Sequence, residues 1–144
     1  MKVETILKAK GSRVATTRPD LTIETIAHRL NMESFGAVVV SNDGKSVLGM
    51  ITERNIVNGL SQHGPELLNM TVESLMSVGI PTCSPDDTLD KVMRQMTLER
   101  ARYLPVLRDG QLCGIISIGD VVRSRLDEIE FETNVLRDAY RANL

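Results

Sequence analysis

The sequence predicts an α+β fold in which two pseudo-symmetric β-α-β-β-α units pack sheet to sheet, followed by a long C-terminal helix. Three observations predict it: an internal repeat, turn and cap signals between the short apolar segments of each copy, and an apolar stripe at helical spacing near the C-terminus. The chain has 144 residues, of which 42% are hydrophobic and only 3% aromatic. We therefore expect a core of Val, Ile, Leu and Met.

The repeat aligns residues 16–44 with residues 82–110 at a constant offset. Identical residues recur at Thr16/Thr82, Pro19/Pro85, Asp20/Asp86, Thr22/Thr88, Glu33/Glu99, Val40/Val106 and Asp43-Gly44/Asp109-Gly110. After a one-residue gap, Gly49, Ile51 and Val57 match Gly114, Ile116 and Val122. The preceding segments 3–7 and 72–76 are also similar, so the repeat indicates a duplication.

Each copy begins with a short extended segment, Thr16-Thr17 or Thr82-Cys83, placed shortly before a proline. A helix follows, with Thr22 or Thr88 as its N-cap and an acidic residue in its first turn. A hairpin comes next, and its turn carries Asp-Gly in both copies. The expected hairpin strands are residues 37–40 with 47–51, and 103–107 with 112–116. Thr52 and Ser117 then cap the last helix of each copy.

These elements place the first unit at residues 8–65, the second at 72–131 and a C-terminal helix extension at 132–144. Residues 62–69 contain Gly64-Pro65 and are interpreted as a short connector. A three-stranded sheet with helices on one side is marginal alone, so we expect the two sheets to pack together.

Composition excludes several classes of function. The net charge of −2 argues against nucleic-acid binding, and no apolar run is long enough for a membrane span or signal peptide. A cytoplasmic location and reduced thiols at Cys83 and Cys113 are expected. His28 and His63 have no ligand partner at metal-site spacing, and no nucleophile–base pair is visible, so neither a metal site nor an enzyme is expected.

The most informative motif is the last turn of each copy, residues 49–55 and 114–120, which has the form Gly-x-x-(Thr/Ser)-x-x-(Asn/Asp). Its hydroxyl caps a helix N-terminus, where free N–H groups and the helix dipole favour an anion. A carboxylate one turn later, such as Asp120, suits a ribose diol, and Arg102 and Arg54 lie near this edge. The pattern alone is common in structural caps, but its presence in both copies favours a nucleotide site.

At these positions the sequence resembles a tandem pair of CBS domains, also called a Bateman module, of the stand-alone bacterial type. The resemblance covers residues 3–126. It is carried by the segments 14–19 and 49–55 in the first copy, and by 80–85, 102–106 and 114–120 in the second. It implies two clefts between the units that take AMP, ADP, ATP, NAD or S-adenosylmethionine, with no cofactor required.

The resemblance also implies roles for individual residues. Ser117 and Arg102 would hold phosphate, Asp120 the ribose, and the backbone of Thr82 and Cys83 the adenine. Further residues would line this cleft: Tyr103, Leu104 and Pro105. The other cleft would be lined by Thr16, Thr17, Ala37, Val38, Thr52, Arg54 and Asn55. We expect this second cleft to be weaker, because Asn55 replaces the aspartate and Gly36 stands where Arg102 stands in the second copy.

The C-terminal segment predicts a helix over residues 119–141. Apolar or small residues recur there at alternating spacings of four and three: Val122, Leu126, Ile129, Thr133, Leu136 and Tyr140. The stripe could pack on its own domain, but it extends beyond the repeat, which favours a homodimer contact. The sequence thus predicts a nucleotide-sensing regulatory module acting on an unknown effector protein. The alternative is an interaction scaffold of the same fold with empty clefts.

Overall fold

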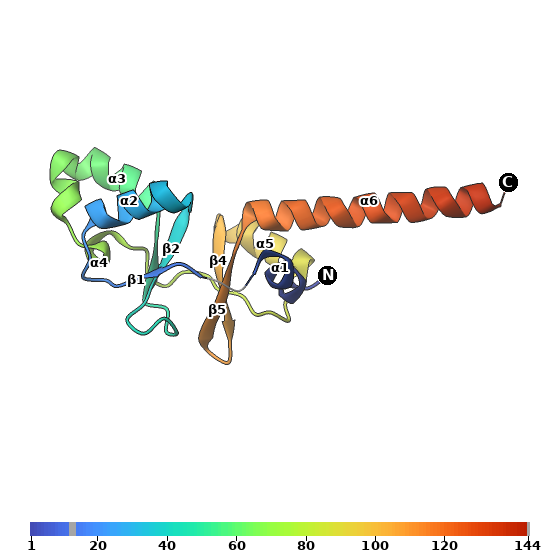
Figure 1. The fold of residues 1–144 in the computed structure, drawn as a ribbon, viewed down its shortest axis with the longest axis horizontal. Coiled ribbons are helices and arrows are strands. Elements are labelled where there is room, and N and C mark those ends of the chain that lie inside the picture. The colour runs from blue at the N-terminus through green and yellow to red at the C-terminus, as the bar shows by residue number, and fades with distance from the viewer. Residues whose placement is uncertain (12–13, 144) are drawn as a thin grey trace.

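The computed structural model describes residues 1–11 and 14–143 and contains both predicted units, which lie side by side (Figure 1). In the first unit a sheet of order β1-β2-β3 is formed by β1 (Thr16–Thr17), β2 (Ala37–Val40) and β3 (Gly49–Thr52). β1 is parallel to β2, and β2 is antiparallel to β3. Helices α2 (Ile23–Glu33) and α3 (Glu53–His63) complete the unit.

The second unit repeats this plan. A hairpin of β4 (Tyr103–Arg108) and β5 (Gln111–Ser117) is flanked by α5 (Leu89–Glu99) and α6 (Ile118–Ala142). Cys83 pairs in parallel with Val106 and so takes the place that β1 has in the first sheet. The α+β architecture with a long C-terminal helix is confirmed.

The predicted N-caps are also confirmed. The side-chain oxygens of Thr22, Thr52, Thr88 and Ser117 each accept a hydrogen bond from the backbone N–H three residues later. Such caps satisfy N–H groups that have no partner inside a helix. The caps therefore fix where each strand ends and each helix begins.

Two elements differ from the prediction. The return strand of the first hairpin was expected from residue 47 but begins at Gly49, because the Asp43 carboxylate accepts the N–H groups of Lys45 and Ser46 and holds the chain in a loop. The expected connector is more regular than predicted. It forms a 3-10 helix, η1 (Gly64–Asn69), and a short helix, α4 (Val72–Leu75).

The two hydrophobic cores exchange their lead-in segments. Helix α1 (Val3–Lys10) precedes the first unit in sequence, yet Val3 and Ile6 are buried in the core of the second unit. Conversely, Leu67 and Val72 are buried in the core of the first unit. The boundaries 8–65 and 72–131 thus describe the sequence repeat, whereas the packed cores cross them.

Equivalent glycines in the two return strands make room for the exchanged segments. Gly49 lies against Met76 and the backbone of Ser77, and Met50 exchanges backbone hydrogen bonds with Ser77 of 2.9 and 3.0 Å. Gly114 lies against the side chain of Leu7 in α1. In both units the missing side chain lets the segment approach the strand closely.

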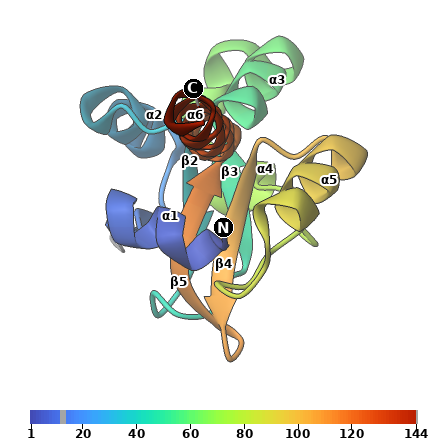
Figure 2. The ribbon, with the colours of Figure 1, turned by 90° about the vertical axis from the view of Figure 1, so that its right-hand side faces the viewer.

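The two units also contact each other directly. The Tyr103 hydroxyl at the start of β4 lies against Gly36 at the start of β2. At the other end of the sheets, the Leu112 N–H donates to the Lys45 carbonyl oxygen at 2.8 Å. The view along the long axis shows the second hairpin in front of the first sheet (Figure 2). The predicted sheet-to-sheet arrangement therefore brings the starts of β2 and β4 together.

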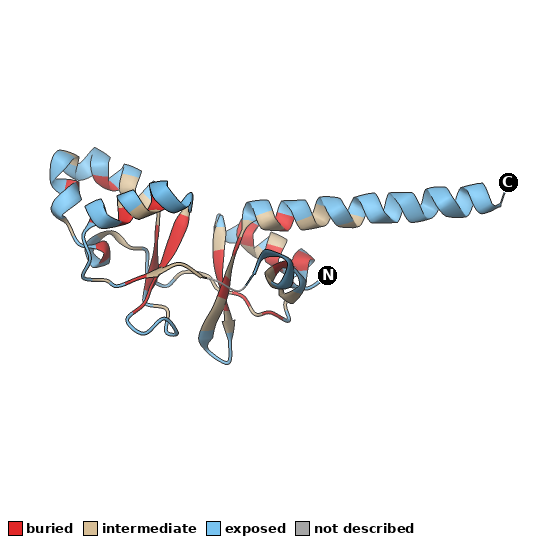
Figure 3. Ribbon diagram, in the orientation of Figure 1, coloured by how far each residue is buried: buried red, intermediate tan, exposed pale blue. Residues whose placement is uncertain are grey.

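Helix α6 runs far past the second unit (Figure 1). Val121 in its first turn is buried in the core, whereas residues 130–143 are exposed (Figure 3). No helix among the described residues combines the length and the apolar character that crossing a bilayer requires.

The glycines give a paired stability test. A Cβ at residue 49 would lie 2.5 Å from the Ser77 carbonyl oxygen, whereas at residue 114 it would lie 2.5 Å from a Leu7 methyl carbon. The Leu7 side chain can rotate away, but the Ser77 backbone cannot. We expect Gly49→Ala to lower the free energy of unfolding by about 2 kcal/mol and Gly114→Ala by less than about 1 kcal/mol. Urea unfolding measures both, and equal losses would contradict this account.

An ion pair at the end of α1 predicts a pH dependence. Lys10 Nζ lies 2.6 Å from Asp120 Oδ2 and 2.9 Å from the Ile115 carbonyl oxygen. Burial raises the pKa of Asp120, but the hydrogen bonds from Lys10 and the Ser117 N–H outweigh it, so the pKa lies below its usual value. The resulting stabilisation is present above the unfolded pKa of about 4 and is lost as the pH falls through the lowered native pKa.

We therefore expect Lys10→Met to lower the free energy of unfolding by about 1 kcal/mol near pH 7. The difference from the unmodified protein should shrink as the pH falls below the unfolded pKa of about 4 and through the lowered native pKa, because Asp120 then becomes protonated. Urea unfolding over this pH range measures both. Lys8→Met is the matched control, because Lys8 only approaches Glu4 to 4.0 Å on the exposed face of α1. A pH-independent loss for Lys10→Met would refute the assignment.

Candidate ligand-binding clefts

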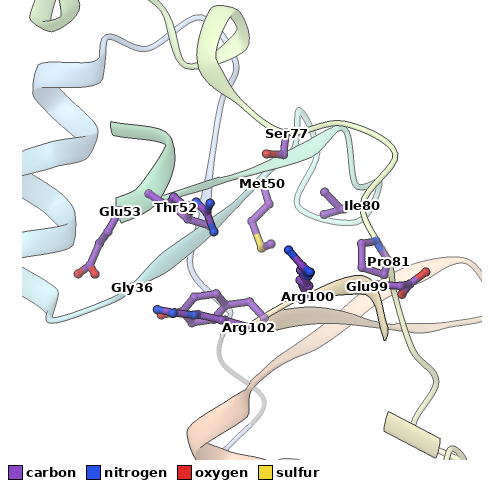
Figure 4. Close-up of a pocket in the computed structure, with 13 residues that line it drawn as sticks. Gly36, Met50, Thr52, Glu53, Ser77, Ile80, Pro81, Glu99, Arg100 and Arg102 are labelled. Atoms are coloured by element: carbon purple, nitrogen blue, oxygen red, sulfur yellow. The ribbon is translucent and has the colours of Figure 1, made fainter. Parts of the chain in front are cut away.

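A pocket of about 270 Å³ lies between the two units. The first unit contributes the start of β2, residues of β3 and the start of α3, and the second contributes the turn between α5 and β4 (Figure 4). Ser77, Ile80 and Pro81, from the part of the chain that links α4 to the second unit, complete the lining. Its lining residues are Gly36, Met50, Thr52, Glu53, Arg54, Ser77, Ile80, Pro81, Glu99, Arg100, Ala101, Arg102 and Tyr103.

The first-unit wall is the Thr52 cap. Thr52 Oγ1 accepts the Asn55 N–H at 3.3 Å, and Asn55 Oδ1 accepts the Thr52 N–H at 2.9 Å. Thr52 Oγ1 also donates to Asn55 Oδ1 at 2.8 Å. Asn55 Nδ2 donates to the Leu75 carbonyl oxygen and to Ser77 Oγ, at 3.2 and 3.1 Å. Both lone pairs and both protons of the amide are thus in use, so Asn55 has no hydrogen bond left for a ligand.

The second-unit wall supplies positive charge. Arg100 ends α5 in a left-handed conformation with φ of 52°, and the chain then turns so that Arg100 and Arg102 lie on the far side of the pocket from Ser77 and Met50 (Figure 4). Arg54 adds a third guanidinium from α3, and Glu53 and Glu99 are the acidic residues in the lining. None of these three arginines forms a salt bridge within residues 1–11 and 14–143. Guanidinium groups in this setting suit a phosphate.

The apolar part of the lining comes from Met50, Ile80 and Pro81. Ile80 and Pro81 precede the first extended segment of the second copy, yet they line the pocket beside the Thr52 cap of the first copy. The pocket therefore combines residues that the sequence assigned to separate clefts: Arg102 and Tyr103 from one, and Thr52 and Arg54 from the other.

The Ser117 cap is the equivalent turn of the second unit, but Ser117 and Asp120 are not among the residues that line the pocket. The Ser117 N–H donates to Asp120 Oδ2 at 2.9 Å, and the Asp120 N–H donates to Ser117 Oγ at 3.1 Å. Lys10 Nζ donates to the same Oδ2, whereas Oδ1 has no hydrogen bond within the described part of the chain. Asp120 thus keeps one carboxylate oxygen that can accept a hydrogen bond, which Asn55 does not.

Arg102 lies next to both places. Its carbonyl oxygen accepts the Ile118 N–H at 2.8 Å, beside the Ser117 cap, while the residue also lines the pocket on the Thr52 side. Arg102 therefore adjoins both the pocket and the Ser117 cap, as does Tyr103, which lines the pocket and pairs with Ser117 in the sheet.

Several other candidate residues are not part of the lining of the pocket between the units. Leu104 and Cys83 are buried in the core of the second unit, and Val38 in that of the first. Ala37, Pro105 and Thr17 are also buried. The carbonyl oxygens of Thr16 and Thr82 accept hydrogen bonds from Arg29 and Gln95. Residues in this group can therefore offer a ligand mainly backbone atoms.

Burial raises the pKa of both cysteine thiols above the usual value. Cys83 and Cys113 are free thiols. Burial, with the nearby Asp87 carboxylate, raises the pKa of Cys83 to about 12. Because the thiolate is the reactive form, Cys83 has a packing role.

Sequence reasoning missed several residues that line the pocket, among them Met50, Ser77, Ile80, Pro81 and Arg100, and it missed Lys10 at the Ser117 cap. For Ile80 a signal existed, since the repeat aligns it with Val14 at the same lead-in position. Lys10 carried no signal, because 110 residues separate it from Asp120.

Comparisons with known proteins agree with this architecture. The CBS domain family model matches residues 10–62 and 72–127. An uncharacterized 17.7 kDa protein of Acidianus ambivalens is 31% identical over 84% of this chain and 76% of its own length. The mitochondrial CBS domain-containing protein CBSX3 of Arabidopsis thaliana is 31% identical over 83% of this chain and 60% of its own length.

Solved structures give the same result. The CBS-domain containing protein ATU1752 of Agrobacterium tumefaciens is 39% identical and superimposes with a TM-score of 0.84 over 87% of this chain and 99% of its own. The CBS domain pair of protein MJ0100, solved with 5'-methylthioadenosine and S-adenosylmethionine, is 22% identical with a TM-score of 0.78 over 89% and 98% of the two chains. The repeat, the exchanged lead-ins and these matches lead to one conclusion: the chain belongs to the CBS-domain family and contains a pair of CBS domains.

Proposed function

We propose that this chain is a regulatory module that binds an adenine nucleotide between its two CBS domains and passes the signal to an effector protein. CBS-domain pairs are generally regulatory rather than catalytic. The observation that carries the proposal is the pocket between the units, which is lined by the capped start of α3 with its Arg54 and by Arg100 and Arg102 of the second unit. A helix N-terminus and guanidinium groups both favour an anion, and a nucleotide brings its phosphates as that anion.

The lining is consistent with the two ends of a nucleotide. Met50, Ile80 and Pro81 offer an apolar surface for a base, and Arg54, Arg100 and Arg102 offer charge for phosphates. The adenosine compounds bound by the MJ0100 domain pair support an adenine-type ligand here as well. The arginines favour phosphorylated members of this class, such as AMP or ATP, over S-adenosylmethionine, whose sulfonium is positively charged.

For the ribose of a nucleotide bound beside the Ser117 cap, a place outside the lining of the pocket at Thr52, we propose Asp120. Its free Oδ1 can accept hydrogen bonds from a diol, and its charge makes such bonds about twice as strong as those of a neutral acceptor. Asn55 cannot take this role at the first cap, because its amide is already saturated by Thr52, Leu75 and Ser77.

A ligand in the pocket at the Thr52 cap can act as a signal because it contacts both domains. Thr52 and Arg102 belong to different domains, so binding favours the relative orientation in which both contact the ligand. The shift equals the difference in ligand affinity between the two orientations. An effector that recognises one orientation would then respond to nucleotide level.

A thermal-shift series tests the proposal. AMP and ATP should raise the melting temperature with concentration, because a ligand that binds only the native state stabilises it. Adenosine should raise it less, since it lacks the phosphate. S-adenosylmethionine and NAD complete the series. No shift with any of them at millimolar concentration would favour the scaffold alternative and refute the proposal.

The variant Arg102→Ala should weaken AMP binding by about 10- to 100-fold in calorimetry, because charge-assisted hydrogen bonds to phosphate are lost. Its affinity for adenosine should change little. Arg141→Ala is the matched control, since Arg141 lies at the far end of α6 and is exposed. An equal loss for adenosine and AMP would show that Arg102 does not contact phosphate.

The two cap variants should behave differently. We expect Asp120→Ala to weaken AMP binding at least tenfold, because a charged acceptor for the ribose is lost. We expect Asn55→Ala to leave the affinity of the folded protein nearly unchanged while lowering its melting temperature, because it cuts the links from α3 to Leu75 and Ser77. Calorimetry that ranks the two affinities in the opposite order would overturn the ribose assignment.

A further inference from the structure

Helix α6 has an apolar stripe that its own chain does not cover. Beyond the first turns the helix projects away from the second domain (Figure 1), and most of its length is exposed (Figure 3). The stripe comprises Val122, Leu126, Ile129, Thr133, Leu136 and Tyr140. The exposed fractions of Leu126, Leu136 and Tyr140 are 60%, 71% and 69%.

The domain packs on a different face of the helix. Val121 is buried in the core, and Glu128 forms ion pairs with Arg125 and with the N-terminal ammonium of Met1, at 3.0 and 3.3 Å. Val121, Arg125 and Glu128 are spaced by four and three residues and so share one face. The stripe lies beside that face, so a partner can reach it without displacing the domain.

We propose that a second copy of this chain covers the stripe, and that the two α6 helices form a parallel, in-register, two-stranded coiled coil. The spacing places Leu126, Thr133 and Tyr140 at a positions and Val122, Ile129 and Leu136 at d positions of a heptad. Because every a and d residue then meets its own copy, the surface is self-complementary.

The charges beside the stripe select this orientation. In a parallel pair, a residue at position g faces the next e position of the other helix. Glu132 at g then meets Arg137 of the second copy, and this attractive contact occurs twice by symmetry. Arg125 at the preceding g position faces Glu130 of the second copy, but it is already paired with Glu128 of its own chain. Neither Glu132 nor Arg137 forms a salt bridge within the described residues of its own chain, so both are available.

The antiparallel arrangement with full overlap is electrostatically unfavourable. There g faces g and e faces e, so Glu132 meets Glu132, Glu130 meets Glu130, and Arg123 meets Arg137. Like charges at these positions oppose pairing. Thr133 adds to the preference, because in the parallel register its hydroxyl meets a second hydroxyl, whereas in the antiparallel one it meets Ile129.

Sedimentation equilibrium of the full chain tests the assembly. We expect a dimer at micromolar concentration and at least a tenfold weaker association for Leu136→Asn, which places an amide in the seam. Phe131→Asn is the matched control: Phe131 is 69% exposed, similar to Leu136, but lies outside the stripe, and its replacement should leave the dimer intact. A monomer, a tetramer, or a dimer that resists Leu136→Asn would overturn the proposal.

Charge variants test the orientation. Glu132→Lys and Arg137→Glu should each weaken the dimer by about tenfold, and the double variant should restore it, because the Glu132–Arg137 contacts are rebuilt with reversed signs. An antiparallel dimer would instead be strengthened by Arg137→Glu, which turns the contact of residue 137 with Arg123 into an attractive one.

Cysteine cross-linking gives an independent reading of register, in a Cys113→Ser background that leaves only the buried Cys83. Oxidation of L136C should give a covalent dimer, because position 136 meets its own copy. A mixture of L126C and L136C should give no mixed dimer. Cross-linking only in the mixture would show the antiparallel arrangement and refute the proposal.

Discussion

The exchange of lead-in segments is the interaction on which the rest of this structure depends. Val3 and Ile6 complete the core of the second domain, while Leu67 and Val72 complete that of the first. Neither domain can bury its apolar residues without chain from the other side of the repeat. The exchange therefore fixes the two sheets against each other, and it brings residues 77–81 beside the Thr52 cap.

The same capped turns serve folding and recognition. Ser117 and Thr52 each end a strand and start a helix, and the N–H groups that make a cap necessary also make it suitable for an anion. The two copies use their third helical residue differently. Asn55 is neutral and spends its amide on internal contacts, whereas Asp120 is charged, is balanced by Lys10 and keeps one oxygen free. The two copies of the same turn therefore differ in charge and in whether a hydrogen-bond acceptor is left for a ligand.

Local patterns predicted most of the fold. The strands, the helices and their N-caps were predicted to within a few residues from spacing and capping signals. The repeat supported these predictions, because most elements could be identified in both copies. The exchange could not be predicted, because the similarity of segments 3–7 and 72–76 shows that they are equivalent but not which core each one enters. The candidate sites were predicted less completely for the same reason. Arg102 and Thr52 were singled out separately, and their shared pocket follows from how the two domains pack.

The crossed lead-ins have a consequence for how such a chain can arise. A polypeptide with one lead-in and one domain would have to insert its own first helix into a neighbouring molecule, and receive that neighbour's helix in return. This is the geometry of a domain-swapped dimer. The present chain has the same connectivity with both halves joined by residues 64–71, so the swap has become intramolecular and its strength no longer depends on protein concentration.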